Sequence, residues 1–117
     1  MEPHAQQQFD FLLLTAVERF TERLVQRNAG AVPALDRLRA EGAGGEVRQF
    51  VDALFQDFLL DNPAGACFVL EALSTRMARP VDGGPISVML VALAKQGFGD
   101  LLCLKAEEAL EQAAAFE

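Results

Sequence analysis

The chain has 117 residues, of which 51% are hydrophobic, 23% are charged and 8% are aromatic. A chain of this length and apolar content buries enough surface to form one folded domain, which argues against disorder. Its 17 acidic and 10 basic residues give a net charge of −7, which repels the phosphates of nucleic acid at long range. We therefore expect a single domain over residues 1–117 that does not bind nucleic acid.

The cysteine pattern and the hydropathy indicate a cytoplasmic protein. Cys67 and Cys103 have no CxxC spacing and lie among apolar neighbours, so we expect free, buried thiols in a reducing compartment. The N-terminal residues lack the basic and apolar regions of a signal peptide. No stretch reaches the roughly 18 to 20 apolar residues that a membrane helix needs, so we expect no membrane partner.

Hydrophobic spacing is helical nearly everywhere and predicts an all-α domain, compact and bundle-like or orthogonal, of five to six helices. The first helix is expected from His4 to Arg27. The apolar residues on its main face are Phe9, Leu12, Leu13, Ala16, Val17, Phe20 and Leu24. The second helix, from Pro33 to Ala40, is expected to end at the glycine-rich loop over residues 42–45.

The third helix is expected from Glu46 to Leu60. Its apolar stripe consists of Val47, Phe50, Val51, Leu54, Phe55 and Phe58. Asn62 followed by Pro63 predicts the start of a fourth helix, because the Asn side chain accepts hydrogen bonds from free amides of the first turn. This helix is expected to extend to about Ala78, where a segment rich in Pro and Gly over residues 80–84 breaks the chain.

The last third of the chain predicts two further helices. The fifth, from Pro85 to Gln96, is apolar on nearly all sides, so we expect it to be buried at the centre. Gly97 and Gly99 are expected to form a turn, and Asp100 is expected to cap a sixth helix that continues to the terminus.

The residue inventory suggests no catalytic, cofactor or metal site. His4 is the only imidazole, and it lies in a terminal segment of the kind that usually frays, so a base for an activated nucleophile is missing. A zinc site needs four ligands, and the chain contains only three Cys and His residues in all. The glycine clusters lack the preceding strand and the Lys of a phosphate-binding loop. We therefore expect no enzymatic activity.

Charge is unevenly distributed along the chain. Residues 1–40 contain as many arginines as acids, so the whole net negative charge lies in residues 41–117. Arg19, Arg23 and Arg27 recur at four-residue spacing, where like charges repel unless an acid faces them. Arg19 can pair with Glu22 on the same helix. For the row as a whole two alternatives stay open, an intramolecular match to the acidic side of the third or sixth helix, and an acidic partner surface.

The first helix also carries apolar residues outside its main face. Phe11, Leu14 and Val25 point away from that face. The segment is therefore either sandwiched between two layers of the chain or covered by another protein, most simply a second copy across a two-fold axis. The candidate partner-binding residues are Phe11, Leu14, Arg19, Arg23, Val25 and Arg27.

The main functional hypothesis is a non-enzymatic cytoplasmic protein-protein interaction module that acts as a homodimer through its first helix. Such a module is a small acidic adaptor, a secretion-type chaperone, an immunity protein or a regulatory inhibitor. The alternative is a carrier or sensor of an apolar small molecule. The pocket residues in that case are Phe50, Phe55, Phe58, Met77 and Met89, which at helical spacing are also typical of an ordinary core.

A third hypothesis is a DNA-binding regulator with a helix-turn-helix around Gly97. Lys105 is the only basic residue on the predicted second helix of that motif, and three glutamates follow it. These carboxylates would face the DNA phosphates, which makes this hypothesis the weakest of the three.

Overall fold

The computed structural model describes residues 3–116 apart from 78–86. Within these residues it has no strand and five helices, which are α1 (Pro3–Asn28), α2 (Ala31–Glu41), α3 (Gly45–Asp57), α4 (Pro63–Met77) and α5 (Ser87–Ala114). The predicted all-α class is confirmed. The chain break predicted over residues 80–84 and the helix start predicted at Pro85 lie outside the described residues.

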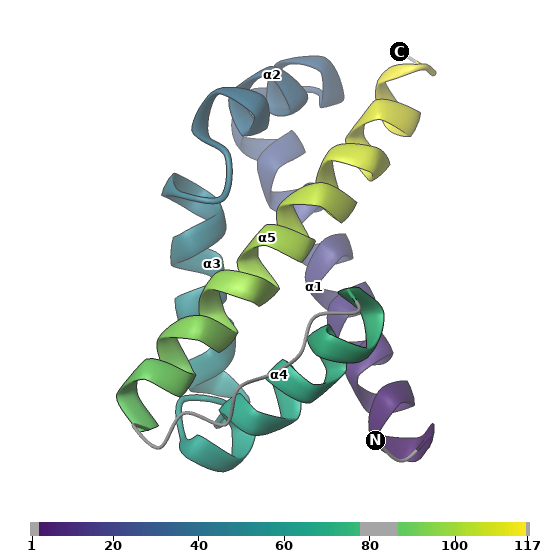
Figure 1. Cartoon of the computed structure of the whole chain (residues 1–117). Coiled ribbons are helices and arrows are strands. Elements are labelled where there is room, and N and C mark those ends of the chain that lie inside the picture. The colour runs from purple at the N-terminus through teal and green to yellow at the C-terminus, as the bar shows by residue number, and fades with distance from the viewer. Residues whose placement is uncertain (1–2, 78–86, 117) are drawn as a thin grey trace.

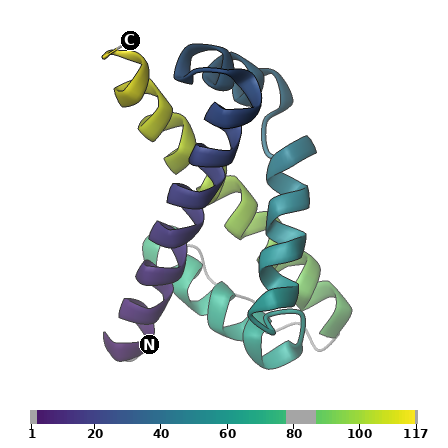
Figure 2. The ribbon, with the colours of Figure 1, turned by 180° about the vertical axis from the view of Figure 1, so that it is seen from behind.

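Helix α5 organises the arrangement of the other helices. It runs diagonally across the front of the molecule in Figure 1 and contacts each of the other four helices. Helix α1 lies on the opposite side and is frontmost in Figure 2, while α4 crosses near the base in both views. The molecule measures 46 × 26 × 23 Å along its principal axes.

The apolar face predicted for α1 forms part of the core, as expected. Phe9 and Phe20 on this face are fully buried. The ring of Phe9 meets the ring of Phe98 edge-on at a centroid distance of 5.9 Å, and Phe55 meets Phe98 at the same distance. Edge-on aromatic pairs add about 0.5 to 1.5 kcal/mol to the gain from burial alone. Phe98 of α5 therefore ties α1 to α3 through the centre of the core.

Helix α5 continues without interruption through the glycine pair, so the turn predicted there was wrong. Phe98, between the two glycines, is fully buried. A Cβ at Gly97 would lie 2.7 Å from Cδ1 of Leu73 on α4, and a Cβ at Gly99 would touch two valines of α3 at 3.8 Å. The glycines therefore allow close packing of α5 on α4 and α3. Without a turn at this position, the helix-turn-helix hypothesis loses the element on which it depended.

The N-terminal half of α5 is not enclosed on all sides, which corrects a second expectation. Met89 and Leu93 are exposed, whereas Ala94 is fully buried. The apolar composition of this segment therefore produces one side that faces the core and one apolar side that faces outward.

Between α3 and α4, the start of α4 agrees with the prediction and the end of α3 does not. The Asn62 side chain caps α4 as predicted, since its Oδ1 accepts the backbone N–H of Gly65 at 2.8 Å. Helix α3, however, ends at Asp57 and not at Leu60. Phe58 therefore lies outside the helix and is half exposed, so its assignment to the buried stripe was wrong.

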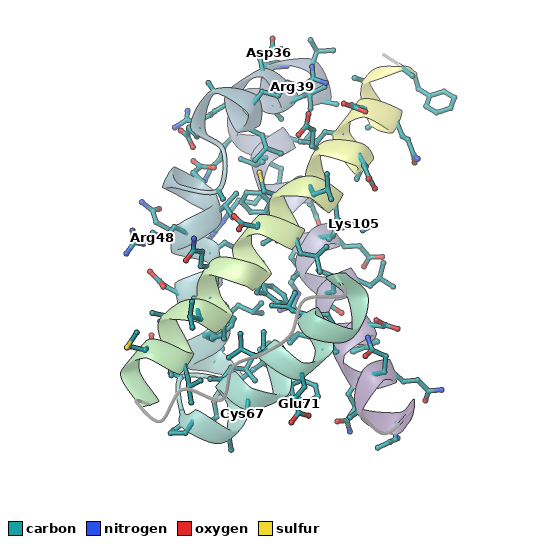
Figure 3. All side chains as sticks on the ribbon, viewed as in Figure 1. Asp36, Arg39, Arg48, Cys67, Glu71 and Lys105 are labelled. Atoms are coloured by element: carbon teal, nitrogen blue, oxygen red, sulfur yellow. The ribbon has the colours of Figure 1, made fainter. Side chains whose placement is uncertain are left out.

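An ion-pair cluster joins α2 to the C-terminal half of α5. Arg39 reaches from α2 toward the end of α5 (Figure 3), where it contacts Glu107 at 3.1 Å and Glu111 at 2.6 Å. These acids lie on the segment predicted as the sixth helix. Their partner is thus an arginine of α2, and none of the described ion pairs joins them to the arginine row of α1.

Candidate functional site

The outward face of α1, defined by Phe11, Leu14 and Glu18, carries two large exposed apolar side chains. Phe11 is 70% exposed and Leu14 is 57% exposed, while Phe9 and Leu13 beside them are buried. This contrast follows from the helical turn of about 100° per residue, which sends neighbouring side chains to different sides. In Figure 2, no other helix passes in front of the N-terminal half of α1. Within the described residues, the sandwiched arrangement is therefore wrong.

Arg27 is part of an intramolecular cluster at the start of α3. Its guanidinium contacts Oε1 of Glu46 at 3.1 Å, and Arg37 of α2 approaches the same oxygen at 3.7 Å. Arg37 also pairs with Glu41 at 3.1 Å. The match to the acidic side of the third helix is thus confirmed for Arg27. Arg27 is consequently removed from the partner-binding set.

Arg19 and Arg23 behave differently from Arg27. Both side chains are exposed, and among the described residues neither makes an ion pair. Glu18 and Glu22 are also exposed and make none, so the expected Arg19 to Glu22 pair is not formed. The exposed part of α1 therefore carries two positive and two negative charges that the described fold leaves to solvent.

Val25 does not belong to the outward face, although the sequence placed it there. Its side chain is half-buried and packs against the core. It lines a shallow hollow of about 400 Å³ between the C-terminal ends of α1 and α5, together with Thr21, Leu110 and Ala113 among others. Of the six candidate residues, Phe11 and Leu14 share the outward face and Arg19 and Arg23 flank it. Val25 packs against the core, and Arg27 forms a surface ion pair with Glu46.

The residues predicted to line an apolar pocket are dispersed. Phe55 is fully buried against Phe98, and Phe50 packs on Phe20 with ring centroids 5.3 Å apart. Phe58 and Met89 are exposed. The Met77 side chain lies outside the described residues. None of the four described residues lines either of the two hollows described here, so these hollows do not support the carrier hypothesis.

A larger groove, of about 840 Å³, lies between α3 and α5 and was missed by the sequence analysis. Its lining combines small and apolar residues with charged ones, and includes Ala43, Gly44, Arg48, Val51, Asp52, Asp61, Pro63, Val91, Ala92, Lys95, Gln96, Gly99 and Asp100. The one local signal for this groove is Lys95, which ends an otherwise apolar segment. The residues that meet here come from α3, α4 and α5, so no spacing along the chain predicts the groove.

Lys95 lies in this groove and links α5 to α3 and to the residues that precede α4. Its Nζ lies 2.9 Å from Oδ1 of Asp61 and 3.3 Å from Oδ1 of Asp52. The hydrogen bond to Asp61, assisted by the one to Asp52, raises the pKa of Lys95 above its ordinary value, although partial burial opposes the shift. Lys95 is therefore a structural clamp between α5, α3 and the start of α4.

The two thiols are free, but they are not both buried as expected. Cys67, at the lower edge of α4 in Figure 3, is exposed, and Cys103 is half-buried. Cys67 lies on the solvent side of α4 because Ala66 and Val69 take the core positions of its turn. Burial raises the pKa of the Cys103 thiol, and the nearby carboxylates of Glu107 and Asp100 add to this effect. Cys103 is therefore poorly suited to act as a nucleophile near neutral pH.

The described residues contain neither a metal-binding cluster nor a helix suited to cross a membrane. No group of three or more His, Cys, Asp or Glu side chains among them is placed to hold a metal ion. None of the helices, over the residues described, combines the length and the hydropathy needed to cross a membrane.

Comparisons with protein-family models, with curated proteins and with solved structures found no match to this chain.

Proposed function

We propose that the chain is a non-enzymatic protein-protein interaction module of the cytoplasm that forms a homodimer through the outward face of α1. The observation that carries this proposal is the exposure of Phe11 and Leu14, at 70% and 57%, on a helix whose other side is the core. Two large apolar side chains on adjacent turns of a rigid helix are typical of helix-mediated association.

The charge distribution favours a second copy as the partner. The whole net charge of −7 lies in residues 41–117, so contacts through most other surfaces bring acid toward acid. The exposed part of α1 around this face is nearly balanced, because Asp10, Glu18 and Glu22 accompany Arg19 and Arg23. Contact through α1 therefore adds less local repulsion between two copies than contact through the acidic surfaces would. A two-fold contact uses the same patch on both copies, which this nearly neutral surface permits.

The proposed absence of catalysis is supported by how the reactive groups are held. The only imidazole, His4, lies in the first turn of α1, where its Nε2 is 3.1 Å from Nε2 of Gln8. Cys67 and Cys103 lie on different helices, and the pKa of Cys103 is raised and not lowered. Within the wider proposal, the roles of an adaptor, a chaperone, an immunity protein and a regulatory inhibitor are all compatible with a helical dimer.

The test is the oligomeric state of matched variants by sedimentation velocity at tens of micromolar. We expect the unmodified chain to sediment as a dimer and the Phe11→Glu/Leu14→Glu variant to sediment as a monomer with unchanged helical circular dichroism. The control is Leu104→Glu/Phe116→Glu, which replaces two other exposed apolar residues and adds the same charge. It is expected to remain dimeric. A strictly monomeric unmodified chain, or a control that dissociates equally, contradicts the proposal.

A further inference from the structure

The corner between α3 and α4, residues 58–62, ends α3 in a Schellman motif. The backbone N–H of Leu60 donates to the carbonyl of Phe55 at 2.8 Å, and the N–H of Leu59 donates to the carbonyl of Gln56 at 3.3 Å. This pair of bonds satisfies two of the carbonyls that a helix end leaves free. It also directs Leu60 into the core, where it is buried together with Phe55.

Leu59 occupies the position of this motif that normally holds glycine. Its φ is +58°, in the left-handed region that a bulky side chain adopts only under strain. The side chain is 74% exposed and is not among those that pack against the core. Leu59 therefore strains the backbone and exposes an apolar side chain, and the described fold gains no packing from it in return. A strained residue of this kind is a reason to look for a function outside the fold.

The neighbouring residues fix the backbone at Leu59. The Asn62 side chain accepts from the Gly65 N–H at 2.8 Å and donates to the carbonyl of Leu59, so it braces the corner on both sides. Gly65 is required for this packing, because a Cβ there would lie 2.6 Å from the Cα of Leu60. A side chain presented on a rigid corner loses little conformational entropy when it binds.

Other exposed apolar residues accompany Leu59 at this end of the molecule. Phe58 is exposed beside it, and Met89 and Leu93 are exposed on the first turns of α5. The start of α5 lies next to the corner, as the bond between Lys95 and Asp61 requires and as Figures 1 and 2 show. Both views place this region away from the N-terminal half of α1, so it is separate from the proposed dimer face.

The charges around the corner are predominantly acidic. Asp57 directly precedes Phe58, is exposed, and makes no ion pair among the described residues. Asp52 and Asp61 share the single ammonium of Lys95. Arg48 and Asp100 line the same groove and offset each other. Among the described residues, the three carboxylates and the ammonium therefore leave two net negative charges beside an apolar tip.

We propose that this corner is a second docking surface, in which Leu59 inserts into the apolar socket of a protein partner whose rim carries Lys or Arg side chains. The apolar tip supplies the contact area, and the acids beside it select a basic rim by charge complementarity. This surface is independent of the homodimer through α1. With both surfaces in use, the chain acts as a bridge between its own second copy and a different protein.

The first test separates docking from folding at Leu59. The variant Leu59→Gly relieves the left-handed strain, so we expect its folding equilibrium constant to rise about fivefold, as measured by urea denaturation. The matched control is Ala29→Gly, which removes a side chain at the only other non-glycine position of the described residues with a left-handed φ. A clear loss of stability in Leu59→Gly would mean that Leu59 has a structural role and would overturn the proposal.

The binding probe is a displayed library of short random peptides, selected on the immobilised unmodified chain and counter-selected on Leu59→Gly. We expect recovered peptides that combine aromatic or aliphatic residues with Lys or Arg, that bind at least tenfold more weakly to Leu59→Gly, and that bind Ala29→Gly normally. Their affinity is expected to fall with added salt. A selection that yields no such peptide, or peptides that do not distinguish Leu59→Gly, contradicts the proposal.

A charge reversal tests the acidic rim. Asp57→Lys is expected to weaken the selected peptides about tenfold, whereas Asp36→Lys makes the same charge change at the far end of the molecule (Figure 3) and is expected to leave binding unchanged. Equal effects of the two variants contradict the role of Asp57. Self-association that is lost in Leu59→Gly but kept in Phe11→Glu/Leu14→Glu identifies a second copy at the corner and overturns the basic-rimmed partner.

Discussion

Gly97 of α5 and Leu73 of α4 pack so closely that a Cβ at position 97 would lie 2.7 Å from Cδ1 of Leu73. The neighbouring Gly99 is less constrained, because its added Cβ would meet two valines at an ordinary 3.8 Å. Two glycines in one helix, separated by a single residue, thus differ in what surrounds them.

This difference predicts unequal effects of two Gly→Ala substitutions. Gly99→Ala is expected to raise the free energy of unfolding by about 0.5 to 1 kcal/mol, because Ala is the better helix former and fits the available space. Gly97→Ala is expected to gain less, because Leu73 must move. Urea denaturation of both variants measures the difference, and equal gains contradict the close contact between α5 and α4.

The side chain of Asn62 predicts a graded loss of stability. Asn62→Ala removes the acceptor for the Gly65 N–H and the donor to the Leu59 carbonyl, so we expect unfolding free energy to fall by about 1 kcal/mol. Asn62→Asp keeps the acceptor and loses only the donor, so its unfolding free energy is expected to lie between those of the unmodified chain and Asn62→Ala. Thermal and urea unfolding of the three proteins test this order. An Asp variant as unstable as the Ala variant would show that the cap is not the important contact.

The raised pKa of Lys95 predicts how its contribution depends on pH. A cation whose pKa is raised by folding stabilises the folded state below its unfolded-state pKa of about 10.4, and this stabilisation is lost as pH rises through the higher folded value. The unfolding free energy of the unmodified chain should therefore exceed that of Lys95→Met by at most about 1 kcal/mol at neutral pH, since the pair is partly exposed.

The difference in unfolding free energy between the unmodified chain and Lys95→Met should be constant up to about pH 10 and shrink above it. Urea unfolding at a series of pH values, with each protein compared at the same pH, cancels the titration of all other groups. Lys105→Met, which removes an exposed pair with Glu108 within one helix, serves as the control. A difference that persists undiminished to strongly alkaline pH contradicts an ionic role for Lys95.

The two thiols are predicted to react at different rates with a thiol reagent. Cys67 is exposed, whereas Cys103 is half-buried and its raised pKa leaves less thiolate at a given pH. We expect Cys67→Ser, which retains Cys103, to be modified several-fold more slowly at pH 8 than Cys103→Ser. In urea the two variants should react alike. Equal rates in the folded state would contradict the half-buried position of Cys103 on α5.

The buried face of α1 could be predicted from the sequence because helix periodicity alone decides it. Phe9 and Phe20 recur on one side of a long amphipathic segment, and any helical fold buries that side. The cap at Asn62 is also a local signal, since its acceptor and the amide that it binds are three residues apart. These features need no knowledge of the other helices.

The features that the sequence analysis missed depend on contacts between distant residues. Gly97 carries the same local signal as a helix end, and packing on Leu73, more than 20 positions away, overrides it. Phe58 continues the spacing of a buried stripe, and it is exposed because Leu60 turns into the core behind it. Of the arginine row, only Arg27 reaches the start of α3, which depends on how the two helices cross and not on spacing.

The contacts of α5 with all four preceding helices have a consequence for the order of folding. Because α5 follows the other helices in the chain, the surfaces of α1 to α4 that it covers stay open until it has been synthesised. A nascent chain that ends before α5 therefore exposes apolar surface that the finished protein conceals, which is the usual condition for aggregation or chaperone binding. The core described here therefore cannot be completed before α5 has been synthesised.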